Sequence, residues 1–144
     1  MVRPPRVLVV EDSTPDFVTL CEALDEVQFR PDLSRVATVA EALALLDDRA
    51  SRPDWIIIDL MLGAERGEDL CAAIARDHRL REVRVIAMSG SLDRVLGSAL
   101  LQVAYTLHKP TAWHDYIRLA TYVRAIMSTA DQVGGSAAAG SAPG

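Results

Sequence analysis

The 144-residue chain contains only two cysteines, Cys21 and Cys71, and both stand in segments with helical apolar spacing. Two such residues build no disulfide framework, and a free cysteine is most often a small core residue. No apolar run reaches the roughly 18 residues that a membrane-spanning helix needs. Residues 1–6 also lack the long apolar stretch of a secretory signal peptide. We therefore expect a soluble cytoplasmic protein with two reduced thiols and no membrane partner.

An excess of basic residues is missing as well. The formal net charge is −5, from 20 acidic and 15 basic residues. A surface that binds nucleic acid needs gathered lysines and arginines, so the composition predicts no nucleic-acid partner. Half of the residues are hydrophobic and 24% are charged. These fractions are typical of one globular domain of this length.

Short apolar runs alternate five times with segments of helical spacing. Because such short connections between parallel strands place helices on both faces of a sheet, the pattern predicts a doubly wound α/β domain. We assign residues 1–129 to this domain. Residues 130–144 hold four of the eight glycines with Ala and Ser, which predicts a flexible tail. The predicted strands are 6–10, 33–37, 55–58, 84–88 and 104–107, and the predicted helices are about 15–27, 39–49, 68–76, 92–102 and 113–129.

Polar side chains stand at the ends of four predicted strands. In an open parallel sheet, ligands bind beyond the carboxyl ends of the strands, so we expect these side chains to converge. Gathered carboxylates repel one another unless a cation neutralises them, and an oxygen-rich site of this kind suits Mg²⁺. The converging residues are Glu11 and Asp12 after the first strand, Asp59 after the third, Ser89 and Gly90 after the fourth, and Lys109 after the fifth.

These groups fit the chemistry of phosphoryl transfer. Lys109 supplies a second positive charge, Ser89 can donate a hydrogen bond, and Gly90 lets a phosphate approach the backbone closely. Together they would stabilise a phosphoryl group in transfer, and a carboxylate is a known covalent acceptor of such a group. Each residue alone is more often a helix cap or a solvated charge. The four matching strand ends together indicate a functional site.

The segments VLVVEDSTPD, WIIIDLMLGAERG, VIAMSG and LHKP, within residues 6–127, resemble the receiver domains of bacterial response regulators. The resemblance implies a flavodoxin-like fold, (βα)5, with five parallel strands in the order 2-1-3-4-5. It implies that Asp59 is the phosphoacceptor and that Asp12 is a metal ligand. Glu11 would join the acidic pocket, and Met61 would bind Mg²⁺ through its backbone carbonyl.

The resemblance also implies roles for the remaining strand ends and for the partner. Ser89 and Gly90 would bind the phosphoryl group and Lys109 would pair with it. The Lys109-Pro110 bond is commonly cis in the family, and Gly67 matches the glycine that closes the loop. The phosphoryl donor would be a sensor histidine kinase or a histidine phosphotransfer protein. The EDSTPD segment is similar to receivers paired with bacteriophytochrome-type kinases. The chain would be a signalling domain with slow self-dephosphorylation and not an enzyme.

Two departures from the family pattern concern the conformational switch. Gly63 stands where the family usually has proline, and Thr106 stands where an aromatic residue swings inward on activation. The neighbouring aromatic residue is Tyr105. Because strand side chains alternate between faces, Tyr105 shares a face with Leu107 and not with Thr106. We therefore expect an output coupling that differs from the aromatic swing.

Two further expectations concern hydrolysis and self-association. Met61 and Ser91, each two residues beyond a site residue, would flank the path of the hydrolytic water, and the bulk of Met61 predicts slow hydrolysis. The fourth helix, fifth strand and last helix are the usual partner face of receivers, so we expect a possible homodimer there. Its candidate exposed residues are Leu92, Val95, Leu96, Tyr116 and Met127.

Two other functions stay open at this point. A pseudo-receiver would bind partners without phosphorylation. The intact set of Asp12, Asp59, Ser89 and Lys109 argues against that interpretation, while Thr106 leaves room for it. A phosphatase of the haloacid dehalogenase type also uses an aspartate at a strand end. Those enzymes carry a second acid two residues later, where this chain has Met61, and they need room for a cap domain. The second function is therefore disfavoured.

Overall fold

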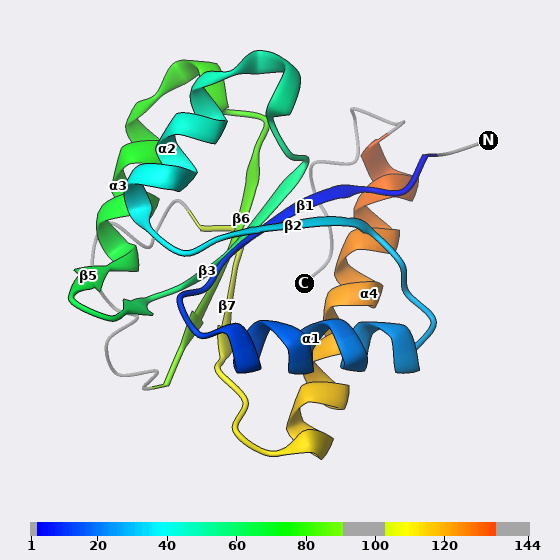
Figure 1. Ribbon diagram of the computed structural model, residues 1–144. Coiled ribbons are helices and arrows are strands. Elements are labelled where there is room, and N and C mark those ends of the chain that lie inside the picture. The colour runs from blue at the N-terminus through cyan, green and yellow to red at the C-terminus, as the bar shows by residue number, and fades with distance from the viewer. Residues whose placement is uncertain (1–2, 91–102, 135–144) are drawn as a thin grey trace.

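A computed structural model of the chain describes residues 3–90 and 103–134, with side chains up to residue 129. A five-stranded parallel sheet forms its centre, in the order β2-β1-β3-β6-β7 (Figure 1). Since β6 and β7 are the fourth and fifth strands of this sheet, the predicted order 2-1-3-4-5 is confirmed. The strands are β1 (Arg6–Val10), β2 (Asp32–Val36), β3 (Trp55–Asp59), β6 (Arg84–Ser89) and β7 (Tyr105–His108).

Helices cover both faces of the sheet (Figure 1). On one face α1 (Thr14–Glu26) packs against α4 (Trp113–Gly134), and on the other face lie α2 (Val39–Asp47) and α3 (Gly67–Arg76). Two core clusters result. Successive residues of β1 alternate between them, with Val9 in the cluster under α1 and α4 and Val10 in the cluster under α2 and α3. This two-sided burial explains why the inner strands are continuous apolar runs.

Local capping explains where the first two helices begin. Ser13 Oγ accepts a hydrogen bond from the backbone N–H of Asp16 at 3.3 Å, and Pro15 stands in the first turn of α1. Thr38 Oγ1 accepts from the N–H of Glu41 at 3.1 Å and so caps the first turn of α2. Helix α2 ends at Asp47, two residues before its predicted end, and the 3-10 turn η1 (Arg49–Ser51) follows.

Besides η1, three short elements were not predicted from the sequence. They are the antiparallel pair β4 (Met61–Leu62) and β5 (Glu65–Arg66) and the 3-10 turn η2 (His78–Leu80). Gly63 between the two short strands has φ +58, a left-handed conformation that glycine adopts readily. Two-residue strands contain no apolar period, so a pattern search does not detect them. The hairpin occupies the segment between Asp59 and α3.

The last helix corrects one predicted boundary. It continues to Gly134, so residues 130–134, which we assigned to the tail, are helical. Alanine, aspartate and glutamine are compatible with a helix interior, and the first glycine of this segment is Gly134 itself. Residues 135–144 and the predicted helix 92–102 lie outside the described residues.

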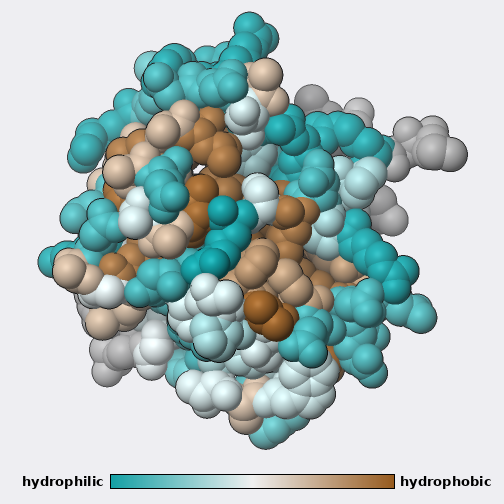
Figure 2. Space-filling view, viewed as in Figure 1, coloured by the Kyte–Doolittle hydropathy of each residue, from teal (hydrophilic) through white to brown (hydrophobic). Residues whose placement is uncertain are grey.

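The expected dimer face is corrected in part. Tyr116 and Met127 are buried in the core under α1 and α4, because their helical spacing turns them toward the sheet, so neither can contribute exposed surface. The exposed aromatic residues of α4 are Trp113 and Tyr122. Leu92, Val95 and Leu96 lie outside the described residues, and dimerisation stays a prediction. On the face that includes α1 and β2, hydrophobic patches over the α2 and α3 region and beside α1 are separated by hydrophilic surface (Figure 2).

Both cysteines are free thiols. Cys71 on α3 is buried, and burial raises the pKa of its thiol to about 12. Cys21 on α1 is only half-buried, so its expected core position is confirmed only in part. Within the described ranges, none of the helices combines the length and the hydropathy that crossing a membrane requires.

Candidate functional site

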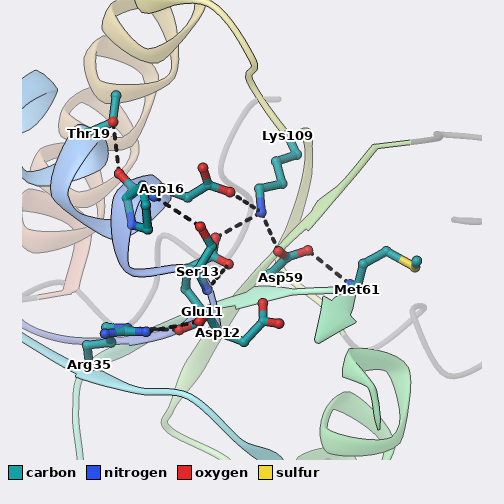
Figure 3. Close-up of polar contacts among 10 residues, drawn as sticks. Glu11, Asp12, Ser13, Asp16, Thr19, Arg35, Asp59, Met61 and Lys109 are labelled. Carbon is teal, nitrogen blue, oxygen red and sulfur yellow. Dashed lines mark hydrogen bonds and ion pairs between the residues drawn. The ribbon is translucent and has the colours of Figure 1, made fainter. Parts of the chain in front are cut away.

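The carboxyl edge of the sheet gathers the predicted site residues, of which Figure 3 shows Glu11, Asp12, Asp59, Met61 and Lys109. Glu11 follows β1, Asp59 ends β3, Ser89 ends β6 and Lys109 follows β7. Glu11 is 2% exposed, and Asp59 and Ser89 are each 1% exposed. Burying charged and polar groups costs free energy unless they are paired, so the contacts among them decide what this edge can do.

Lys109 is the only lysine of the chain and forms the centre of the site. Its Nζ lies 2.5 Å from Oδ2 of Asp59, 2.9 Å from Oε1 of Glu11 and 3.0 Å from Oδ2 of Asp16. An ammonium group has three N–H donors, and each of them has a carboxylate acceptor here. Burial by itself would lower the pKa of Lys109, but the hydrogen bonds to these three carboxylates outweigh burial and raise it. The lysine is therefore a fixed positive charge.

A second cation fits beside this lysine. Glu11, Asp12 and Asp59 each offer one carboxylate oxygen, and the three oxygens lie within 4.8 Å of one another. Burial raises the pKa of Glu11 to about 6, even though the hydrogen bond from Lys109 lowers it. Asp12 is exposed at the rim of the cluster. A half-open set of hard oxygen ligands with excess negative charge is what Mg²⁺ and Mn²⁺ prefer in proteins.

The two oxygens of Asp59 have different surroundings. Oδ2 faces Lys109, while Oδ1 accepts a hydrogen bond from the backbone N–H of Met61 at 2.9 Å. The side chain of Met61 is 54% exposed and points away from Lys109 (Figure 3). The carboxylate is thus held at both oxygens, with Oδ2 turned toward the positive charge.

Because Gly67 has no side chain, the loop after β3 can lie close to the end of that strand. A Cβ atom at this position would lie 2.4 Å from the backbone oxygen of Asp59 and 2.7 Å from Cα of Leu60. The N–H of Gly67 also donates to the carbonyl of Leu60 at 3.0 Å. Any side chain here would push the loop away from Asp59, which agrees with the predicted role of this glycine. A Cβ at Gly90, in contrast, would meet no atom of the described residues within 4 Å.

The end of β7 places Lys109 beside β6, but the following peptide bond differs from the expected one. The backbone N–H of Lys109 donates to the carbonyl of Ser89 at 2.8 Å, which fixes the lysine beside the end of β6. The part of the chain that the structure describes contains no cis peptide bond, so the expectation of a cis Lys109-Pro110 bond is wrong here. Trans is the lower-energy isomer even before proline. Ser91 lies outside the described residues.

The alternation predicted for β7 is confirmed. The ring of Tyr105 lies 6.4 Å from the ring of Trp55, and Leu107 packs against the core cluster that contains Trp55. Tyr105 therefore lies on the α1 and α4 side of the sheet, where it is 41% exposed. Thr106, which pairs with Ala87 of β6, points to the opposite face.

Sequence reasoning missed two residues of this site, Asp16 and Arg35. Asp16 stands in the first turn of α1, and Arg35 of β2 donates hydrogen bonds to the backbone carbonyls of Glu11 and Asp12. A signal for Asp16 was available, because it stands four residues after Asp12 in the EDSTPD segment. A side chain that acts through backbone carbonyls, as Arg35 does, leaves no such spacing signal.

Comparisons with known proteins support the resemblance to response-regulator receiver domains. A family model described as response regulator receiver domain matches residues 7–119. The transcriptional regulatory protein CpxR of Klebsiella pneumoniae subsp. pneumoniae (strain HS11286) is 29% identical over 122 residues, which cover 85% of this chain and 49% of CpxR. The chain thus spans about half the length of this curated relative.

Solved structures share the fold, and they include two response regulators with more than 25% identity to this chain. The phosphorylated cyanobacterial phytochrome response regulator RcpA is 27% identical with a TM-score of 0.74, and the Mn²⁺-bound response regulator Rcp1 is 26% identical with a TM-score of 0.72. Each match covers 83% of this chain and 91% of the solved chain. Because the family model covers most of the chain and agrees with its fold, the chain belongs to the receiver domain family of two-component response regulators.

Proposed function

We propose that this receiver domain accepts a phosphoryl group on Asp59 from a sensor histidine kinase or a histidine phosphotransfer protein, with Mg²⁺ as cofactor. The observation that carries the proposal is the 2.5 Å contact between Lys109 Nζ and Asp59 Oδ2, beside the carboxylates of Glu11 and Asp12. A buried carboxylate next to a fixed cation and an oxygen-rich cation pocket is the arrangement that phosphoryl transfer to a carboxylate requires.

The transfer step uses the oxygen that faces Lys109. Oδ2 of Asp59 attacks the phosphorus of a phosphohistidine in line, the new O–P bond forms, and the N–P bond breaks with its electron pair returning to the imidazole. Lys109 loses its contact with a free carboxylate oxygen and gains one with a phosphoryl oxygen. Its charge therefore stays next to the negative charge throughout the step.

Glu11, Asp12, Asp59 and the backbone carbonyl of Met61 would hold Mg²⁺. When bound, Mg²⁺ supplies positive charge that balances the phosphoryl oxygens. The positions of the three carboxylates support this assignment, and the solved relative Rcp1 was described in an Mn²⁺-bound form.

The signal leaves the site through a change of conformation. Ser89 is buried at the end of β6 next to Asp59, so its hydroxyl can hydrogen-bond a phosphoryl oxygen that arrives there, and Gly90 leaves its backbone open to that oxygen. Phosphorylation then shifts the population between two conformations around this strand end. Water later attacks the phosphorus, releases inorganic phosphate and restores the carboxylate, which resets the domain without a separate catalytic activity.

The partner to test first is a phytochrome-type photoreceptor kinase. The solved relative RcpA is a cyanobacterial phytochrome response regulator, and the EDSTPD segment points the same way. Histidine kinases draw their phosphoryl group from cytoplasmic ATP, so we infer a cytoplasmic location. The two free thiols are in keeping with a reducing compartment.

Acetyl phosphate, a small phosphoryl donor, tests the proposal directly. The protein is incubated with acetyl phosphate and Mg²⁺ and its intact mass is measured. We expect the mass of one phosphoryl group to be added, the addition to disappear in Asp59→Asn, and EDTA to prevent it. Asp69→Asn is the matched control, since Asp69 is an exposed aspartate at the start of α3, and it should be phosphorylated normally. No added mass from acetyl phosphate or phosphoramidate would instead indicate a pseudo-receiver.

A further inference from the structure

The side chain of Arg35 forms two hydrogen bonds to the turn that contains Glu11 and Asp12. Its Nε donates to the backbone carbonyl of Glu11 at 2.8 Å, and its Nη2 donates to the backbone carbonyl of Asp12 at 3.2 Å. The guanidinium carbon also lies 5.6 Å from the centre of the Phe17 ring, which is a cation–π contact. Figure 3 shows Arg35 on the side of the turn away from Lys109.

The same strand holds this turn at a third point. The N–H of Glu11 donates to the carbonyl of Val36 at 3.0 Å, and Val9 pairs with Arg35 in the ladder between β1 and β2. The backbone of Glu11 and Asp12 is therefore tied to β2 at one N–H and two carbonyl groups. Two of these three ties come from the Arg35 side chain.

The carboxylates of Glu11 and Asp12 need this support because the turn is at the end of the sheet. Among the described residues, the bond of the Glu11 N–H is the last backbone hydrogen bond between this segment and β2, and Asp12 is exposed. A planar guanidinium forms two hydrogen bonds in a fixed fork and stays charged at all relevant pH values. It therefore fixes the direction in which both side chains leave the backbone. Such support of ligand residues raises metal affinity by pre-organising the ligands.

We propose that Arg35 is a positioning residue for the cation pocket, holding the carbonyls of Glu11 and Asp12 so that their carboxylates face the Mg²⁺ position. The inference rests on the proposed function of the same site. Arg35 itself would touch neither the cation nor the phosphoryl group, since its hydrogen bonds go to backbone carbonyls. Its removal should lower the affinity for Mg²⁺ and leave the chemical groups of the transfer step in place.

The test compares Mg²⁺ binding by calorimetry, and Mn²⁺ binding by electron paramagnetic resonance, in the wild type and in Arg35→Met. We expect the affinity to fall about ten-fold, the lower end of the effect of losing a residue that orients metal ligands. Phosphorylation by acetyl phosphate should need correspondingly more Mg²⁺ and reach nearly the wild-type rate at saturation. Arg35→Lys, which keeps the charge without the fork, should bind with intermediate affinity.

Arg52→Met is the matched control. Arg52 Nε donates to the carbonyl of Leu46 at 2.8 Å, the same kind of bond at the end of α2. Urea denaturation measures how much stability each variant loses. We expect Arg52→Met to lose stability and keep wild-type Mg²⁺ affinity. Equal Mg²⁺ affinity in Arg35→Met and the wild type, or an equal loss in Arg52→Met, would overturn the role of Arg35. A wild type that binds no Mg²⁺ would overturn the proposed function instead.

Discussion

Oδ2 of Asp16 lies 3.0 Å from Nζ of Lys109, so the first turn of α1 is tied directly to the residue that follows β7. Asp16 is the third carboxylate on this ammonium, after Asp59 and Glu11. The hydrogen bonds that Lys109 donates to all three raise its pKa against the effect of burial, which lowers it. A protonated amine is not nucleophilic, so amine reactivity reports on these contacts.

Asp16→Ala should make Lys109 several-fold more reactive toward an amine-selective acylating reagent at pH 9 in EDTA. The substitution removes one acceptor and one negative charge, so the pKa of Lys109 falls and a larger fraction of the amine is free. Because Lys109 is the only lysine, peptide mass spectrometry reads its labelling without interference. Asp16→Asn, which keeps an acceptor oxygen, should label at an intermediate rate.

Asp115→Ala is the control for this measurement. Asp115 is the first-turn acid of α4 and contacts His114 at 3.3 Å. Its removal should leave the labelling rate of Lys109 at the wild-type value. An unchanged rate in Asp16→Ala as well would mean that Asp16 does not hold the lysine in solution.

Gly67→Ala should destabilise the domain and slow phosphorylation. The new Cβ would lie 2.4 Å from the backbone oxygen of Asp59, and the nearest atoms belong to the backbone, which yields poorly. Forcing an extra carbon into such a site costs about 1–3 kcal/mol. Urea denaturation measures the loss in the free energy of unfolding, and acetyl phosphate labelling measures the effect on Asp59.

Gly90→Ala is the matched glycine control, because a Cβ there meets no atom within 4 Å in the part of the chain that the structure describes. We expect its free energy of unfolding to stay within about 0.5 kcal/mol of the wild type, as is usual at open positions. An equally small loss of stability in Gly67→Ala would contradict the close packing of the loop after β3 against Asp59.

The sheet was predictable because its inner strands are buried on both faces. Every residue of β3 is buried, and such a strand is a continuous apolar run in the sequence. The β4 and β5 pair was not predictable in the same way, since two residues contain no period. The predicted end of α4 was wrong because the Gly, Ala and Ser content of residues 130–144 indicates a flexible tail. The first glycine of that stretch is Gly134, so the helix can continue to it.

The site residues that stand at the carboxyl ends of parallel strands were predictable, because ligands bind at that edge of an open sheet. The other site residues were not. Glu11, Asp59, Ser89 and Lys109 each stand at the carboxyl end of a parallel strand, and that position alone brings them together. The EDSTPD segment marks Asp16 as a candidate, but its contact with Lys109 depends on the direction in which α1 leaves the sheet, and residue spacing does not encode that direction.

Tyr105 should stay on the α1 and α4 side of the sheet when the domain is activated. Its ring lies 6.4 Å from Trp55, and the inward swing of related receivers starts from the next position, here Thr106. The chain has three tyrosines, so ¹⁹F spectra of fluorotyrosine-labelled protein resolve each of them, with Tyr105→Phe as the assignment. Adding beryllofluoride, which stands in for the phosphoryl group, should shift Tyr105 little. A large shift, with an activated structure that has Tyr105 turned inward, would contradict this.

Met61→Asn should shorten the lifetime of phosphorylated Asp59. Met61 follows the phosphoacceptor by two residues and its side chain is 54% exposed, so it lies where an attacking water would approach. A bulky apolar side chain cannot orient that water, whereas an amide of smaller volume can donate and accept hydrogen bonds. The lifetime is measured by removing the phosphoryl donor and following the phosphorylated fraction by intact mass. Val18→Asn introduces the same amide at another exposed apolar position, on α1, and should leave the lifetime unchanged. Equal lifetimes in Met61→Asn and the wild type would show that hydrolysis is not controlled from this position.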